Sequence, residues 1–129
     1  MPDTAHTRAY LQSRIHEERA RHARHGHPFA IIIFEALPAT DGVAVPRRIA
    51  WLIEALQRHV RPSDVIARAF EDTVVVLLVE TDETGARDAL FRLRGMIAES
   101  GSASRWRIAC YAYPRDAAAI AELPLLAAA

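Results

Sequence analysis

Polar residues interrupt the apolar stretch 61–79 at two places where chemistry could be held. Arg61 and Asp64 lie three positions apart before one apolar run, and Glu71 and Asp72 lie between that run and the next. Guanidinium groups bind phosphates and carboxylates, and carboxylate groups bind cations. Because polar residues at turns often carry function, both places are candidate sites. The simpler alternative for the first is ordinary turn chemistry, in which Asp64 caps the backbone.

Three histidines, His22, His25 and His27, form a second polar group around Gly26. Imidazole is a good ligand for zinc and copper, so the group is a candidate metal site. No cysteine or carboxylate stands at ligand spacing, however, and Gly26-His27-Pro28 is typical of a helix end. We therefore expect a solvated helix end here rather than a metal centre.

Composition limits the function classes that remain. The 129 residues, 51% of them hydrophobic, are enough for one compact domain, and 16 basic residues balance 16 acidic ones. No net field attracts nucleic acid or an anionic membrane, and no apolar run approaches the ~20 residues of a membrane span. The single Cys110 lies in an apolar run, where we expect a small buried residue, and it fits a reducing compartment. We expect a cytoplasmic protein that neither binds nucleic acid nor inserts into membranes.

The strands that would position the candidate groups follow from apolar runs. Residues 65–69 and 74–79 are predicted as two strands joined by a four-residue polar reversal at 70–73. The second of these strands is apolar on both faces, as is the run 29–35, so both are expected in the middle of a sheet. Residues 106–113 are predicted as a last strand, which Pro114 ends.

Two helices are predicted to pack on this sheet. Residues 47–60 place apolar side chains at spacings of three and four, after a loop at 38–46. A second helix follows a cap at 81–84. Its apolar stripe consists of Ala86, Leu90, Leu93 and Ile97.

The ends of the chain carry weaker signals. Residues 4–25 are predicted as a polar helix whose thin apolar stripe (Leu11, Ile15, Ala20) suggests that it lies across the outside of the domain or continues a helix of a partner region. Residues 117–129 are expected to be a weakly structured tail, interrupted by Pro124. The whole chain, 1–129, is then one α+β domain: a helix followed by a ferredoxin-like βαββαβ core at 28–116, with a mainly antiparallel sheet and two helices on one face.

The core residues resemble a known family. Arg61-Pro62-Ser63-Asp64-Val65-Ile66-Ala67-Arg68, the following hairpin and the helix containing Gly85-Ala86 are similar to the second half of a GGDEF domain, the catalytic domain of diguanylate cyclases. Tyr113-Pro114-Arg115-Asp116 resembles that family's Tyr-Pro-x-Asp ending. The similarity extends from about Arg8 to Asp116, and it implies the GGDEF, nucleotide-cyclase-like fold.

The resemblance places the family's catalytic turn on residues 70–74, where only Asp72 is kept. Phe70 and Glu71 replace two glycines that let backbone N–H groups approach the nucleotide phosphates. Asp72 and Glu35, which falls where the family has a metal-binding aspartate, could still hold magnesium. Leu37 replaces a second aspartate. We therefore expect a degenerate domain that is not an enzyme, with no catalytic residues, no assigned metal site and no cofactor.

The loop at 38–46 agrees with this expectation. It is several residues shorter than the family's loop and has no counterpart of the asparagine that contacts the guanine base; Asp41 is most simply a turn residue. The family's Leu-Thr-Gly-Leu-x-Asn-Arg motif near the N-terminus is also absent.

The flank of the turn differs, because the resemblance implies that a ligand site is retained there. Arg61 and Asp64 match the family's Arg-x-x-Asp inhibitory motif, and ungapped counting places Arg92 at the arginine of the following helix. In the family this site binds cyclic di-GMP, usually as a stacked pair, which could bridge two chains into a homodimer. Arginine suits phosphates and the acceptor edge of guanine, and aspartate suits its donors. We expect all three side chains to be exposed; the simpler role for Arg92 is an ion pair with Asp88.

The predicted function is therefore an inactive GGDEF-like receptor for cyclic di-GMP. One alternative is a nucleotide-independent interaction or dimerisation module that binds a partner signalling protein through its sheet edge, its N-terminal helix or Trp51. The other is a residual metal-dependent nucleotidyl cyclase that uses Glu35 and Asp72.

Overall fold

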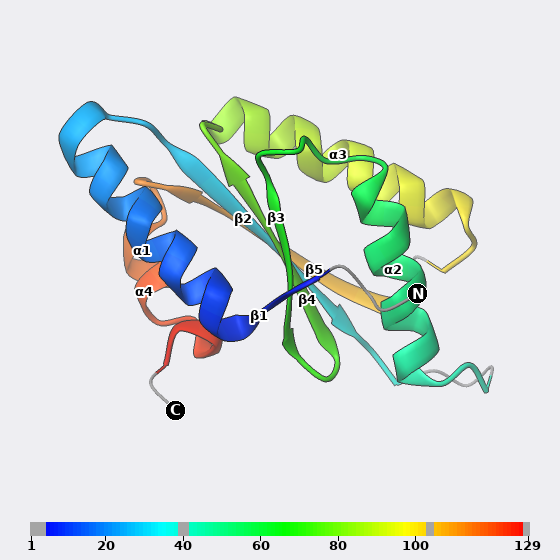
Figure 1. Ribbon diagram of the computed structural model, residues 1–129. Coiled ribbons are helices and arrows are strands. Elements are labelled where there is room, and N and C mark those ends of the chain that lie inside the picture. Colours follow the sequence, from blue (N-terminus) through cyan, green and yellow to red (C-terminus); the bar gives the residue numbers. More distant parts are fainter. Residues whose placement is uncertain (1–4, 39–41, 103–104, 128–129) are drawn as a thin grey trace.

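The computed structural model describes residues 5–38, 42–102 and 105–127. Figure 1 shows a sheet with helices on both of its faces. The elements are, in chain order, β1 (His6–Thr7), α1 (Arg8–His25), β2 (Phe29–Ala36), α2 (Val45–Gln57), β3 (Val65–Phe70), β4 (Thr73–Val79), α3 (Glu83–Glu99), β5 (Trp106–Tyr113), α4 (Ala117–Ala121) and the 3-10 turn η2 (Pro124–Leu126).

The sheet has the predicted ferredoxin-like arrangement. Its strand order is β1-β3-β4-β2-β5, and the pairs β3–β4, β4–β2 and β2–β5 are antiparallel. Every residue of β4 is buried, and β2 is buried along most of its length, because both strands are apolar on both faces. The two-residue β1, which pairs in parallel with β3, was not predicted. The α+β fold class and the central positions of β2 and β4 are confirmed.

The first face of the sheet is covered by α2 and α3, as the apolar spacing predicts. Ile49, Leu52, Ile53 and Leu56 of the predicted α2 stripe are buried, whereas Val60 lies beyond the end of the helix at Gln57 and is half-buried. In α3 the buried positions include Ala89, while Leu90 is only half-buried. Helix α2 begins at Val45, two residues before the predicted start. Pro46 is accommodated in its first turn because no intrahelical partner is needed there for the missing N–H group.

The second face corrects two expectations about the chain ends. The stripe of α1 was expected to be too thin for a core helix, but Leu11 and Ile15 are buried against β2, β3 and β4. Ile120 and Leu125 complete this second core, so the segment 117–127 is packed and not weakly structured. The cause is the apolar second face of the central strands, which must be covered.

The boundaries of two further segments are also defined. Helix α1 begins after Thr7, whose side chain accepts a hydrogen bond from the backbone N–H of Tyr10, and ends at Gly26 in the left-handed conformation (φ 74°). The β3–β4 reversal is a two-residue turn, Glu71–Asp72, rather than four residues. Asp41 and the predicted helix start at residue 4 lie outside the described residues. Within the described chain, no helix has the length and apolar character needed to cross a bilayer.

The register of the strands places the candidate groups at two opposite ends of the sheet. Glu35 pairs with Thr73 and with Arg107 in the neighbouring strands, so it lies at the end that carries the β3–β4 turn. Arg61 precedes β3 and therefore lies at the opposite end, where β4 finishes at Val79. A six-residue strand such as β3 spans about 20 Å. The turn and its flank are thus two distinct places.

Candidate functional site

The carboxylates at the turn end of the sheet are both engaged within the protein. Glu35 accepts a hydrogen bond from Nη1 of Arg107 at 3.1 Å. Asp72 Oδ1 accepts from the hydroxyl of Thr73 at 2.9 Å, and the Asp72 carbonyl accepts from the N–H of Ala36 at 2.8 Å. The described residues contain no group of three His, Cys, Asp or Glu side chains that could hold a metal ion.

The histidine group lies where α1 ends. The rings of His25 and His27 meet edge to face at 5.8 Å, and His22 meets the ring of Tyr113 in the same way at 5.1 Å. Gly26 ends the helix between them, as predicted. His27 Nδ1 lies 3.4 Å from the carboxylate of Glu80.

The opposite end of the sheet carries a cleft of about 640 Å³, which we call the arginine cleft. Arg61, Asp64 and Arg92 all line it, so the three residues selected from the sequence do come together. The cleft lies where the end of α2, the start of α3 and the connections before β2 and after β4 meet. The other lining residues are Pro28, Arg58, His59, Val60, Leu78, Glu80, Thr81, Asp82, Gly85, Asp88 and Ala89.

Asp64 corrects the expectation that all three side chains are exposed, because its side chain is only 2% exposed. Its Oδ2 accepts from the backbone N–H of Arg61 at 3.0 Å, and its Oδ1 accepts from the N–H of Val79 at 3.2 Å. The carboxylate therefore ties the turn before β3 to the end of β4. This is the backbone-capping role that the sequence left open as the simpler alternative.

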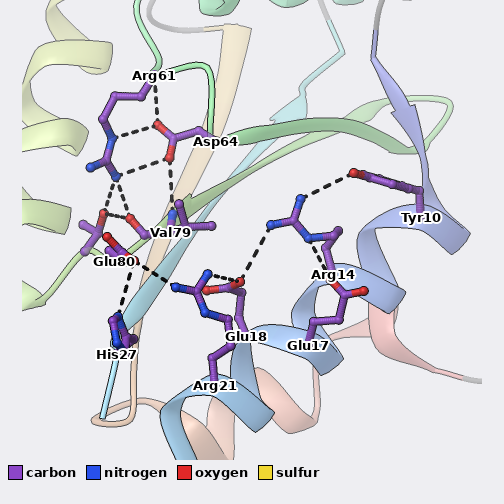
Figure 2. Close-up of polar contacts among 11 residues, drawn as sticks. Tyr10, Arg14, Glu17, Glu18, Arg21, His27, Arg61, Asp64, Val79 and Glu80 are labelled. Carbon is purple, nitrogen blue, oxygen red and sulfur yellow. Dashed lines mark hydrogen bonds and ion pairs between the residues drawn. The ribbon is translucent and has the colours of Figure 1, made fainter. Parts of the chain in front are cut away.

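Arg61 is held by the same connections but reaches solvent, with 54% of its side chain exposed. Its Nη2 donates to the carbonyl of Val79 at 2.6 Å, to the hydroxyl of Thr81 at 2.9 Å and to Asp64 at 3.3 Å. Figure 2 shows that the guanidinium is hydrogen-bonded through Nε and Nη2, while its Nη1 makes no contact with the other residues drawn. The Nη1 group could therefore donate to a phosphate oxygen or to a purine acceptor.

Arg92 lines the arginine cleft from helix α3. It is exposed, as predicted, and its Nη2 donates to the carbonyl of His59 at 3.3 Å. Asp88, the ion-pair partner considered from the sequence, lies one helical turn before it and lines the same cleft. Arg92 thus ties α3 to the connection between α2 and β3.

An ionic chain that the sequence did not suggest joins the wall of the cleft to α1 (Figure 2). Glu80, which adopts a left-handed backbone conformation (φ 47°), pairs with Nη2 of Arg21 at 2.8 Å. Arg21 also pairs with Glu18, which is buried, and Arg14 contacts Glu18 from the preceding turn. The signal available in the sequence was the Arg14, Glu18, Arg21 spacing of four and three, which places these side chains on one side of a helix.

The segment that resembles the Tyr-Pro-x-Asp ending closes the second face of the sheet. Asp116 Oδ2 accepts from the N–H of Ala112 at 2.8 Å and from Nη2 of Arg115 at 3.0 Å. The hydrogen bond from Arg115, followed by that from Ala112, lowers the pKa of Asp116. Its ionised form therefore anchors the turn between β5 and α4.

We expect Asp116→Asn to lower the free energy of unfolding at pH 7 by about 1 kcal/mol, the usual value of one such hydrogen bond. Because folding lowers the pKa of Asp116, its contribution is present at neutral pH and is lost as the pH falls below about 4. Urea unfolding at pH 7 and at pH 3 should show the difference between parent and variant shrinking in acid. A constant difference would contradict the assignment; Asp88→Asn is the exposed control.

Cys110 lies on β5 and is half-buried rather than fully buried. Burial, followed by the nearby Asp116 carboxylate, raises the pKa of its thiol. The thiol is therefore protonated at neutral pH, which makes it a poor nucleophile.

Comparison with known proteins identifies the fold. No family model and no curated protein matches this sequence. The structure of a DGC protein from Thermotoga maritima matches with a TM-score of 0.79 at 18% identity, covering 98% of each chain. The GGDEF domain of TpbB (YfiN) from Pseudomonas aeruginosa matches with a TM-score of 0.71 at 17% identity, covering 88% of this chain and 74% of that one. The chain has the GGDEF fold.

A third GGDEF structure concerns a ligand. It is a microbial GGDEF domain described as showing a novel interaction mode with cyclic di-GMP, and it matches with a TM-score of 0.61 at 14% identity over 85% of this chain and 71% of that one. At these identities the likeness establishes the GGDEF fold and leaves the function to be argued from the side chains of this chain.

Proposed function

We propose that this GGDEF-fold chain is an inactive, cyclic di-GMP-binding domain and that the arginine cleft is its ligand site. One observation carries the proposal: Arg61 and Arg92, both exposed, border one cleft of about 640 Å³. Cyclic di-GMP offers two phosphates and two guanine acceptor edges, which are the groups that guanidinium binds best. The cyclic di-GMP complex of another GGDEF domain supports the ligand class.

The acidic residues of the cleft are compatible with an anionic ligand because most of their charges are already engaged. Asp64 is paired with Arg61, and Glu80 is paired with Arg21. Asp82 accepts from the N–H of Gly85 at the start of α3. Asp88 remains on the exposed face of α3, where its carboxylate would accept from guanine N1 and N2 in place of the buried Asp64.

The absence of cyclase activity is the second half of the proposal. Phe70 and Glu71 occupy the turn where the resemblance expects glycines, and Glu35 is paired with Arg107. A nucleotide triphosphate would therefore meet a side chain and a negative charge at the place of its phosphates. Incubation with GTP and magnesium should yield no cyclic dinucleotide, and turnover that disappears in Asp72→Ala would instead support the residual cyclase.

Calorimetry with cyclic di-GMP tests the receptor directly. We expect saturable binding with two ligand molecules per chain, because the proposed site holds a stacked pair, and light scattering should show a dimer when ligand is present. Heat that fits one ligand per chain, with an unchanged monomer, would overturn the stacked pair. The absence of any heat at high micromolar ligand, with the protein folded, would overturn the receptor itself.

The alternative of a protein-interaction module has its own supporting observation. Phe91 on α3 is 81% exposed, and aromatic side chains are enriched at protein interfaces. This alternative predicts no response to cyclic di-GMP and loss of partner binding in Phe91→Ala. The receptor predicts that Phe91→Ala binds the nucleotide as the parent does.

A further inference from the structure

A second cleft, of about 330 Å³, lies at the opposite end of the sheet from the arginine cleft. We call it the tryptophan cleft. It lies between the first half of α2 and the segment that leads from the end of α3 into β5. Its lining residues are Val43, Arg47, Arg48, Trp51, Ser100, Ser102, Arg105 and Trp106.

The charged side chains among the described lining residues of this cleft are all basic. Three arginines and no acidic residue occur among the described residues that line it, although the chain as a whole has no net charge. The N-terminal end of α2 adds to this field, because Ala44 provides no side-chain cap and the first turn contains no acidic residue. Arg47, Arg48 and the N-terminal end of α2 therefore favour an anion beside them.

Arg48 shows that the positive charge is not fully satisfied by the protein. Arg48 is only 5% exposed, and its Nη1 donates to the carbonyl of Arg105 at 3.2 Å. Its buried Nε has no hydrogen-bond partner in the described structure. A buried guanidinium is costly unless it is paired and hydrogen-bonded, so an acceptor entering the cleft would stabilise it.

The two tryptophans supply an apolar, planar surface beside these cations. Trp51 is 37% exposed and Trp106 is buried, with the Arg48 guanidinium 6.0 Å from the centre of the Trp106 ring. Exposed indole faces favour stacking with other aromatic rings. The cleft thus combines an aromatic wall with anion-binding groups at a distance that a small molecule can span.

We infer that the tryptophan cleft binds a small ligand that joins a planar aromatic ring to a carboxylate or phosphate group. The ring would lie against Trp51, and the anionic group would accept from Arg47 and Arg48. The cleft has about half the volume of the arginine cleft and lies at the other end of the sheet, so it is separate from the cyclic di-GMP site. The GGDEF fold would then hold two ligand sites of different chemistry.

Nuclear magnetic resonance provides a site-specific readout, because the chain has two tryptophans and both line this cleft. We would titrate the 15N-labelled chain with adenosine monophosphate and phenylacetate, which carry the ring with a phosphate or with a carboxylate. Adenosine, which has the ring without the phosphate, and inorganic phosphate, which has the anion without the ring, are the controls. At least one of the two aromatic anions should shift both indole N–H signals saturably and bind at least tenfold more tightly than either half.

Variants locate the binding groups. Arg47→Gln, at an exposed position, should weaken binding of the aromatic anion at least tenfold, whereas Arg87→Gln, at an exposed position on α3, should leave it unchanged. Trp51→Leu should weaken binding of the aromatic anion to a similar degree, and the indole N–H signal of Trp106 still measures binding in this variant. The inference is overturned if neither aromatic anion shifts the indole signals, if phosphate alone binds equally well, or if Arg47→Gln and Trp51→Leu bind as the parent does.

Discussion

The Arg61→Ala variant is expected to bind cyclic di-GMP at least tenfold more weakly than the parent chain. Arg61 lines the arginine cleft with a side chain that is 54% exposed, while Val79 and Thr81 hold its Nη2 in place. A hydrogen bond to a charged group contributes about 1.5–3 kcal/mol, and 1.4 kcal/mol corresponds to a factor of ten in affinity. Calorimetry of folded variants measures the change.

Two further variants separate the chemistry of Arg61 from its structural role. Arg61→Lys keeps the charge but loses the planar fork, so its affinity should fall between those of the parent and the alanine variant. Arg92→Ala removes the second guanidinium and should also weaken binding about tenfold. Arg94→Ala, on the same helix but outside the arginine cleft, should have no effect. Parent-like affinity in both Arg61→Ala and Arg92→Ala would show that the ligand binds elsewhere.

The Asp64→Ala variant is expected to lose about 2–3 kcal/mol of the free energy of unfolding. The Asp64 carboxylate is almost fully buried and accepts from the backbone N–H groups of Arg61 and Val79. Removing it leaves the N–H of Val79 without this partner and releases the Arg61 guanidinium from its ion pair. Chemical denaturation with urea measures the loss, and binding should weaken because Arg61 is no longer positioned.

Asp88→Ala is the matched control for stability, since Asp88 lines the same cleft but is exposed on α3. A surface substitution of this kind changes stability by no more than about 0.5 kcal/mol. If Asp64→Ala were as stable as Asp88→Ala and lost only ligand binding, Asp64 would be a ligand-contacting residue and our structural assignment would be wrong.

The sequence predicted the fold well because the signals were local and periodic. The apolar stripes of α2 and α3 require a sheet face to pack on. The runs of β2 and β4, which are apolar on both faces, require cover on both faces of the sheet. Sequence patterns failed for α1 and the segment 117–127. Their apolar stripes are thin, and only the presence of the apolar second face of the sheet gives them a place to bury.

The candidate site was predicted in its residues but not in its geometry. Arg61, Asp64 and Arg92 could be selected along the chain, and the structure brings them to one cleft. That Asp64 is buried depends on Val79, which is 15 residues away and reaches Asp64 only through the β3–β4 pairing. The pairing of Glu80 with Arg21 on α1 could not be found from the sequence for the same reason.

The sequence by itself therefore determined the βαββαβ core and the chemical types of the cleft residues, because periodicity and side-chain chemistry are properties of short segments. The tertiary structure alone decided which of those side chains are exposed to solvent and which are buried in hydrogen bonds within the protein. It also brought Trp51 and Trp106, 55 positions apart in the sequence, to one cleft with Arg48. Such choices depend on contacts between distant segments, which the packing of helices on the sheet creates.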